Sequence, residues 1–219
     1  MQRLHPKFHL YIEANQHQQN SEQRYFSELN RQFKHINIDP NLSLTDLKKK
    51  AKISKKKKYH DQYKVDHFAA IIDGDIDYNN YEKSVEARIK EISKICHDTD
   101  ISIYLSNRHW ENWIVLHYQS FQKFTDNNTM LPIPDYEKTK KWYRKHMNSL
   151  FKNMDKAMKN SKKLRQIQYL NNNYNYTDIN HMPSFQNKND IKKILELNPI
   201  TYIDILIDKM IDMERSFKI

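Results

Sequence analysis

The stretch that decides the fold class is Phe68-Ala69-Ala70-Ile71-Ile72-Asp73-Gly74-Asp75-Ile76-Asp77. Gly74 is the only glycine among 219 residues, whereas average usage is roughly 7%. The apolar run before it is short and continuous, which is typical of a strand buried on both faces of a sheet. In open α/β sheets, the residues just beyond the carboxyl ends of the strands line the ligand crevice. We therefore expect a buried strand over 68–72, followed by a ligand-binding loop that carries Asp73 and Asp75.

The Asp-Gly dipeptide has a second interpretation, because it also suits a tight hairpin turn. A helix and not a second strand is predicted to follow, since apolar residues recur at helical spacing between 79 and 96. These residues are Val85, Ile89, Ile92 and Ile95. A metal or phosphate site is therefore the favoured interpretation, and a plain turn stays open.

The order strand, polar loop, helix occurs three times. Strands are predicted over 8–12, 68–72 and 101–106, and helices over 21–33 and 110–118, in addition to the one that ends near 96. This order is that of a small, parallel, doubly wound sheet whose site is assembled from strand ends. The fold class expected from the residues is therefore α/β.

Four further polar residues stand at or near the strand ends. Glu13 follows the first strand, and Glu22 lies in the first turn of the next helix, for which Ser21 is the expected N-cap. Glu13 has an alternative role as a solvated acid, and Glu22 as a first-turn acid favoured by the helix dipole. Asn107 either contributes to the site or caps the following helix. Glu111 lies in an apolar segment, where an unpaired carboxylate is costly, so a partner is expected.

The formal net charge of +10 favours a polyanionic partner. One basic cluster, 48–58, is expected to be a mobile loop. The other, 138–165, has eleven Lys or Arg residues against the single acid Asp155, and on a helix it would present a positive face. Such a face binds nucleic acid or is merely solvated. The candidate nucleic-acid-binding residues are Lys55, Lys56, Lys57, Lys58, Lys141, Arg144 and Lys145.

Several classes of protein are excluded by composition. No stretch approaches the roughly 20 apolar residues of a membrane span, and the first residues contain no apolar signal-peptide core. Cys96 is the only cysteine, which excludes an internal disulfide framework and a multi-cysteine zinc site. We therefore expect no membrane partner and a reducing cytoplasmic location.

Taken together, the motifs resemble the RloB-like family of TOPRIM proteins over roughly residues 8 to 120, and more faintly near 198–201. The residues that carry the resemblance are Glu13, Ser21-Glu22-Gln23-Arg24-Tyr25-Phe26, Asp73-Gly74-Asp75 and Ser106-Asn107-Arg108-His109-Trp110-Glu111-Asn112-Trp113-Ile114-Val115-Leu116-His117-Tyr118. Each motif alone is weak, but their order and spacing together are fairly specific.

The resemblance implies a TOPRIM sheet in which Glu13, Asp73 and Asp75 bind Mg²⁺ or Mn²⁺ for phosphodiester chemistry. Glu22 and Glu111 match further acids of the family pattern and are counted as catalytic, and Asn107 matches its Ser-Asn element. The resemblance also implies a role in anti-phage defence by abortive infection, together with a partner ATPase of the ABC or AAA type.

These observations lead to one expected architecture. A TOPRIM-like catalytic domain with a small parallel sheet flanked by helices spans 1–125, and a basic helical extension over 126–219 packs on the same core. Ala14 stands where the family usually has a glycine. No lysine adjoins the acids in the sequence, although the run 55–58 could reach them.

The expected function is that of a metal-dependent nuclease that hydrolyses DNA or RNA, with tRNA among the candidates. The alternative is a non-catalytic subunit that has the TOPRIM fold and binds nucleic acid or the ATPase. A third candidate is a TOPRIM enzyme that joins nucleotides, but no clear triphosphate cradle is present. Self-association into a homo-oligomer is left open.

Overall fold

The computed structural model describes residues 5–13, 20–57, 66–74, 76–96, 100–107, 110–120, 133, 135–174, 179–181, 185 and 187–217. In chain order, the elements are β1 (Lys7–Ile12), α1 (Ser21–Leu29), a 3₁₀ turn (Asn30–Gln32), β2 (Asn37–Leu42), α2 (Leu44–Lys57), β3 (His67–Asp73), a second 3₁₀ turn (Tyr78–Asn80), α3 (Tyr81–Cys96), β4 (Ser102–Asn107), α4 (Glu111–Leu116), α5 (Lys140–Lys152), α6 (Met154–Asn171), α7 (Lys188–Glu196), β5 (Ile200–Thr201) and α8 (Ile203–Ser216).

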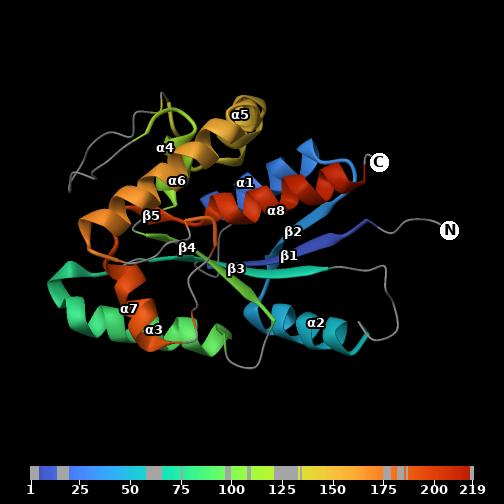
Figure 1. The fold of residues 1–219 in the computed structure, drawn as a ribbon. Helices are drawn as coiled ribbons and strands as arrows, with labels where there is room; N and C mark the ends of the chain where they lie inside the picture. Colours follow the sequence, from blue (N-terminus) through green and yellow to red (C-terminus); the bar gives the residue numbers. More distant parts are fainter. Residues whose placement is uncertain are drawn as a thin grey trace.

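The strands form one five-stranded sheet in the order β2-β1-β3-β4-β5 (Figure 1). The pairs β2/β1, β1/β3 and β3/β4 are parallel, and only β5 runs antiparallel to its neighbour. Helices cover both faces, with α1, α4, α5, α6 and α8 above the sheet in Figure 1 and α2, α3 and α7 below it. The predicted α/β class with a small, mostly parallel sheet flanked by helices is confirmed.

The central strand β3 divides its side chains between two hydrophobic cores. Ala69 and Ile71 belong to the core on one face, and Phe68, Ala70 and Ile72 belong to the core on the other. This alternation follows from the two-residue period of a strand. The continuous apolar run therefore marked a strand that is buried on both sides, as predicted.

The strand β2 was not predicted. Its sequence, Asn37-Ile38-Asp39-Pro40-Asn41-Leu42, contains no apolar run. A proline within a strand is tolerated at a sheet edge, where one side of the backbone has no ladder to maintain, and β2 is the edge strand next to β1. Its assignment depends on parallel pairing with β1 and not on its own pattern.

The lysine-rich segment 48–58 is not a mobile loop where the structure describes it. Residues up to 57 belong to α2, whose Leu47 and Ala51 are buried against the sheet. Lysine is a good helix former, and two small or apolar residues four positions apart anchor one side of the helix while the lysines face solvent. The prediction failed because it weighed charge above spacing. Lys58 lies outside the described residues.

The second basic cluster forms two helices, α5 and α6, and not one. The exposed residues Lys141, Arg144 and Lys145 lie on α5. Arg165, in contrast, has no solvent exposure and forms an ion pair with Asp204 of α8. It therefore does not belong to the positive face that the sequence predicted.

The helices of residues 140–216 share core contacts with the earlier elements. Met147 of α5, Leu164 of α6 and Leu206 of α8 pack in the same hydrophobic cluster as Phe8 and Phe26. The predicted division into 1–125 and 126–219 stays a prediction. In the part of the chain that the structure describes, no helix is both long and apolar enough to cross a membrane.

Candidate active site

Three strands deliver polar residues to one edge of the sheet. Glu13 follows β1, Asp73 ends β3 and Asn107 ends β4. Because these strands are parallel and neighbours, their carboxyl ends meet there. The Glu13 N–H donates to the carbonyl of Ile71 at 3.1 Å, and Asp73 is paired in register with Ser106. The edge predicted from the order of strands and acids is therefore formed.

Gly74 allows a close approach between two of these strand ends. A Cβ at this position would lie 2.3 Å from Oδ1 of Asn107. Its φ is not positive, so the glycine supplies space and not an unusual backbone conformation. The Asn107 side chain cannot easily move aside, because its Nδ2 donates to the carbonyls of Leu195 at 2.8 Å and Leu197 at 2.7 Å.

Asn107 does not cap α4. The N-cap of that helix is Trp110, which makes no side-chain capping bond. The backbone carbonyl of Asn107 accepts a hydrogen bond from Nδ2 of Asn112 at 2.9 Å. Asn107 thus links the end of β4 to α4 and to the carboxyl-terminal end of α7, and so fixes these three elements relative to one another.

Gly74→Ala is expected to destabilise the protein by roughly 1–3 kcal/mol, the usual cost of overpacking a close contact. The loss is expected to shrink in an Asn107→Ala background, because the two nearest atoms, Oδ1 at 2.3 Å and Cγ at 2.6 Å, are then absent and only Cβ at 2.8 Å remains. Urea unfolding of the four proteins in this cycle measures the coupling. An equal cost of Gly74→Ala in both backgrounds would show that Asn107 is not the obstacle.

The start of α1 places Glu22 at the same edge. The N-cap is Asn20 and not Ser21: its side chain accepts from the N–H of Gln23, whose own side chain accepts from the N–H of Asn20. Nδ2 of Asn20 also donates to the carbonyl of Glu13 at 2.7 Å. This reciprocal capping box fixes the helix to the end of β1 and leaves Glu22 buried in the first turn.

Glu22 lies within a cluster of charged groups. Burial raises its pKa to about 7, and the nearby charge of Glu111 adds to this effect. The charge of Lys138 and a hydrogen bond with Asp73 act in the opposite direction. A hydrogen bond between two carboxyl groups requires a proton on one of them. With its pKa near 7, the Glu22 carboxyl group is protonated in a substantial fraction of molecules at neutral pH.

Glu111 has the partner that its apolar surroundings required. Nζ of Lys138 lies 2.6 Å from Glu111 Oε1, and the hydroxyl of Tyr136 donates to the same oxygen at 3.4 Å. Burial lowers the pKa of Lys138, but the hydrogen bond to Glu111 and the charges of Glu22 and Asp73 outweigh it, so the net shift is upward. Lys138 therefore remains a cation beside three acids.

Glu13 forms an ion pair on the other side of this edge. The guanidinium of Arg88, on α3, donates to Glu13 Oε1 at 2.5 Å and to Glu91 Oε2 at 2.9 Å. The Arg88 side chain is 11% exposed and that of Glu13 is 32% exposed, so the pair is partly shielded from solvent. The structure thus brings Glu22, Asp73 and Glu111 together, while Glu13 pairs with Arg88. Asp75 lies outside the described residues.

The carboxylates at this edge meet some of the requirements of a divalent-cation site. Within the described residues, no three His, Cys, Asp or Glu side chains are grouped as a metal site requires. Glu22 and Asp73 nevertheless share a hydrogen bond, and their oxygens are the ligand type that Mg²⁺ and Mn²⁺ prefer. A cation bound at Asp73 would offset the repulsion between the two carboxylates.

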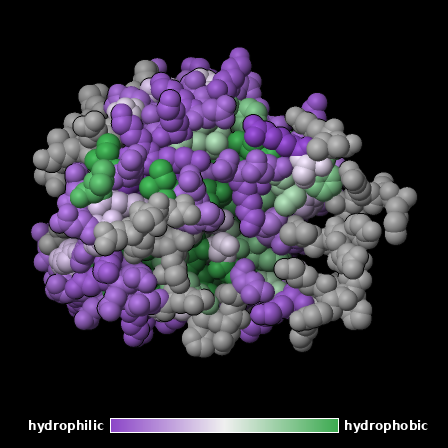
Figure 2. Space-filling model, in the orientation of Figure 1, coloured by the Kyte–Doolittle hydropathy of each residue, from purple (hydrophilic) through white to green (hydrophobic). Residues whose placement is uncertain are grey.

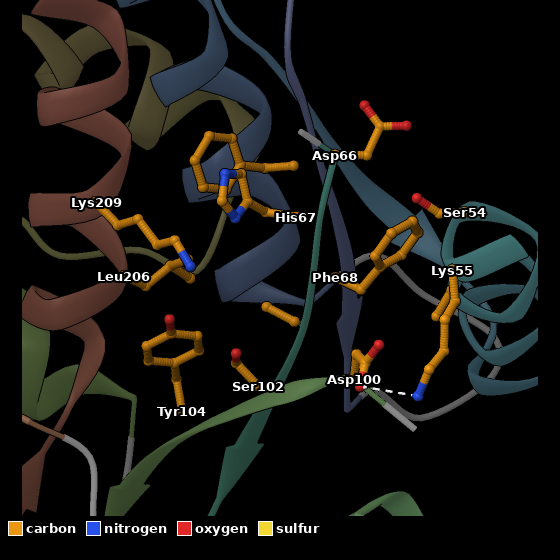
Figure 3. A pocket seen from close by; sticks show the side chains of 13 residues that line it. Ser54, Lys55, Asp66, His67, Phe68, Asp100, Ser102, Tyr104, Leu206 and Lys209 are labelled. Atoms are coloured by element: carbon orange, nitrogen blue, oxygen red, sulfur yellow. Dashed lines mark hydrogen bonds and ion pairs between the residues drawn. The ribbon is translucent and has the colours of Figure 1, made fainter. Parts of the chain in front are cut away.

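Lys55 lies at the opposite edge of the sheet and does not reach the acids. Its Nζ is 3.5 Å from Asp100, which precedes the amino-terminal end of β4. Figure 3 shows this pair beside Phe68 and Ser54, at a cavity of about 230 Å³. The side chains of Lys56 and Lys57, and all of Lys58, lie outside the described residues. The cation expected from the run 55–58 is supplied instead by Lys138.

Sequence reasoning missed Lys138, Tyr136 and Arg88. Lys138 is one of eleven basic residues in its segment, and nothing in the local pattern distinguishes it from the others. Arg88 lies among charged residues of an amphipathic helix, where an exposed side chain is the default. Both become part of the site through contacts with residues far away in the chain.

Glu22→Gln is expected to raise the free energy of unfolding more at pH 8 than at pH 5. The raised pKa of Glu22 means that the folded chain retains a proton that the unfolded chain releases between pH about 4.5 and about 7. Wild-type stability therefore falls across that window, by on the order of 2–3 kcal/mol, and glutamine has no such titration.

Urea unfolding at both pH values, with chelator present, measures this difference. The matched control is Glu137→Gln, a change at an exposed acid of the same region, for which the two pH values should agree. A pH-independent effect of Glu22→Gln would contradict the buried, protonated state of this carboxyl group.

Comparison with known proteins identifies one family. The model of the family described as RloB-like protein matches residues 17–210, which is most of the chain. No curated protein and no solved structure matches. The matched range includes Glu22, Asp73, Asn107, Glu111 and Lys138, and begins after Glu13.

Proposed function

This chain belongs to the RloB-like family, and from that premise we propose that it is a metal-dependent nuclease that hydrolyses phosphodiester bonds of DNA or RNA, tRNA included. The observation that carries the proposal is the convergence of Glu22, Asp73, Glu111 and Lys138 at the carboxyl edge of a mostly parallel sheet. A mostly parallel sheet flanked by helices is also consistent with a TOPRIM-like fold.

The protonation states in this cluster suit phosphodiester hydrolysis near neutral pH. A general base works best when its pKa lies close to the operating pH, and the pKa of Glu22 is raised to about 7 by burial. Lys138 stays protonated and partly exposed, so that it can neutralise charge on a bound phosphate as negative charge develops in the transition state. Glu111 orients Lys138, and the Tyr136 hydroxyl donates in turn to Glu111.

The proposed cofactor is Mg²⁺ or Mn²⁺. Asp73 would hold it, with Asp75 and Glu13 as the further ligands expected from the sequence, and Glu22 beside Asp73 would remain available as the general base. When bound, such an ion lowers the pKa of a coordinated water and neutralises phosphate charge. Glu13 would bind the ion through Oε2, because Arg88 holds Oε1 in this structure.

The basic face of α5 is the proposed contact for substrate phosphates. Lys141, Arg144 and Lys145 are exposed on this helix, which begins two residues after Lys138. Contacts of this kind give affinity without reading base sequence. Nη1 of Arg24 also donates to the carbonyl of Lys138 and so ties the start of this segment to α1.

The family resemblance supports the wider proposal of an anti-phage effector that works with an ABC- or AAA-type ATPase in the cytoplasm. One observation favours the alternative of a non-catalytic subunit: Glu13 and Glu111 are both occupied by cationic side chains. In that case, the site would bind a partner or nucleic acid without cleaving it.

A cleavage assay separates the two proposals. Purified protein, alone and with its ATPase where one is encoded nearby, is incubated with labelled plasmid DNA or total tRNA in Mg²⁺, Mn²⁺ or chelator. We expect cuts that require the metal and are absent in chelator. Intact substrates under every condition, together with unchanged binding in chelator, would favour the binding subunit.

A further inference from the structure

A second basic surface lies on the other face of the sheet from α5. An open groove of about 1170 Å³ runs between α3 and α7 and reaches α2. These helices cover the lower face in Figure 1, and the surface over α3 and α7 is mainly hydrophilic in Figure 2. Six lysines line the groove: Lys48, Lys83, Lys90, Lys94, Lys188 and Lys192.

The charge of this groove is largely uncompensated within the described residues. Glu86 is the only acid in its lining. Lys192 lies 4.0 Å from Glu82, but both side chains are well exposed, at 45% and 77%, and such pairs are weak. Nζ of Lys48 donates to the carbonyl of Lys94 at 2.6 Å, which leaves its charge in place. The groove is therefore a concentrated positive site.

The spacing of the lysines suits an extended chain of negative charges. Lys83, Lys90 and Lys94 lie within about 40° of one another around α3 and span about 16 Å along its axis. A nucleic-acid strand carries a charge about every 3.4 Å along a helix axis, so this row covers about five nucleotides.

The chemistry of the lining favours contacts with the backbone over contacts with bases. Among the described residues, the lining contains no aromatic side chain to stack on a base and no arginine to form a bidentate pair. Lysine is a mobile point charge that tolerates any phosphate geometry. Ala87 and Ile89 provide a small apolar floor.

The groove is also connected to the candidate active site. The chain enters α3 shortly after Asp73 and Gly74, so the Lys83 end of the row lies toward the edge that carries the acids. The far end of α7 is bonded to that edge, where Asn107 holds the carbonyls of Leu195 and Leu197. A strand bound at the acids can therefore continue along α3.

We propose that the groove between α3 and α7 binds the phosphate backbone of a nucleic acid, outside the segment held at the acids and α5. The charge row along one helix, the lysine-only chemistry and the position beside the site favour this occupant over an acidic protein segment. The inference extends the proposed function, because the same nucleic acid is the substrate, and it rests on that function for its biological role.

The test is the binding of a fluorescent single-stranded RNA, measured in chelator so that no cleavage occurs. The groove variant is Lys83→Gln/Lys90→Gln/Lys188→Gln. Its control, Lys34→Gln/Lys193→Gln/Lys209→Gln, removes the same charge at exposed lysines outside the groove and outside α5, one of them on α7 itself. For the groove variant, we expect the slope of the log binding constant against log salt concentration to become less steep by about two units. We expect its affinity to fall about 10- to 100-fold near 100 mM salt.

A second measurement locates the contact without mutation. RNA is expected to protect the groove lysines from acetylation, while Lys34 and Lys193 remain reactive. Equal losses in the groove and control variants, or no protection, would overturn the proposal. Groove-dependent binding of polyglutamate, with RNA binding unaffected, would also overturn it and assign the surface to a protein partner.

The outcomes also distinguish this inference from the proposed function. If no metal-dependent cleavage is found but groove-dependent RNA binding persists, the nuclease proposal fails and the groove stands. If cleavage is found and the groove variant binds and cuts as the control does, the groove fails and the nuclease stands.

Discussion

The Asp73→Ala/Asp75→Ala variant is expected to abolish metal-dependent cleavage while the fold is retained. Asp73 lies at the carboxyl end of β3, outside both hydrophobic cores, and its removal eliminates the carboxylate that shares a hydrogen bond with Glu22. Loss of two anionic oxygen ligands leaves too few donors for a hard divalent cation. The measurement is single-turnover cleavage of the substrate that the cleavage assay selects, with circular dichroism as the check on folding.

The matched control removes two carboxylates from elsewhere on the surface. Asp155 of α6 and Asp212 of α8 are exposed, so Asp155→Ala/Asp212→Ala should cut at the wild-type rate. Wild-type cleavage by the Asp73→Ala/Asp75→Ala variant would show that the assignment of the metal ligands is wrong. Glu22→Gln should fall between the two, with a loss of roughly 10²- to 10⁴-fold if Glu22 is the general base.

Arg165→Met is expected to produce the largest loss of stability, about 3–5 kcal/mol. The Arg165 and Asp204 side chains are both fully buried. Nη2 of Arg165 donates to Asp204 Oδ2 at 2.7 Å, and Nη1 donates to the carbonyl of Thr201 at 2.8 Å. Removal of the guanidinium leaves the carboxylate charged in the interior without its counter-ion, which costs more than the pair itself contributes.

A second substitution separates the buried charge from simple loss of packing. Arg165→Met/Asp204→Leu removes both charges and should be more stable than Arg165→Met alone, because no carboxylate then remains unpaired. Arg144→Met is the exposed control: 60% of this side chain is exposed, and Glu28, 3.8 Å away, keeps its closer ion pair with Arg31 at 2.7 Å, so the loss should have little effect. Urea unfolding measures all three, and a double variant that is no more stable than Arg165→Met would contradict the argument.

The strands could be predicted where their own residues carry the signal. The run 68–72 is apolar throughout because the strand is buried on both faces. For β2, burial is partial and the edge position accepts Pro40, so its sequence resembles a loop. The segment 48–57 was misread as a loop because its charge concealed the spacing of Leu47 and Ala51, which bind the helix to the sheet.

The candidate site could be predicted only to the extent that strand ends imply it. Glu13, Asp73 and Asn107 follow from the order of strands, since parallel neighbours end at one edge. Glu22 and Glu111 were added by the family resemblance alone. Their approach to Asp73 results from how α1 and α4 pack above the sheet, and no local pattern encodes that.

By itself, the sequence determined the apolar strands, the polar residues at their ends and the position of the one glycine, because neighbouring residues specify all of these. The tertiary structure alone decided which side chains contact one another. Gly74 serves the side chain of Asn107, Lys138 stands beside the acids, and Arg165 is a core residue and not a surface base. The physical reason is that a charged side chain acquires its role from the groups that packing places around it, and those groups come from distant parts of the chain.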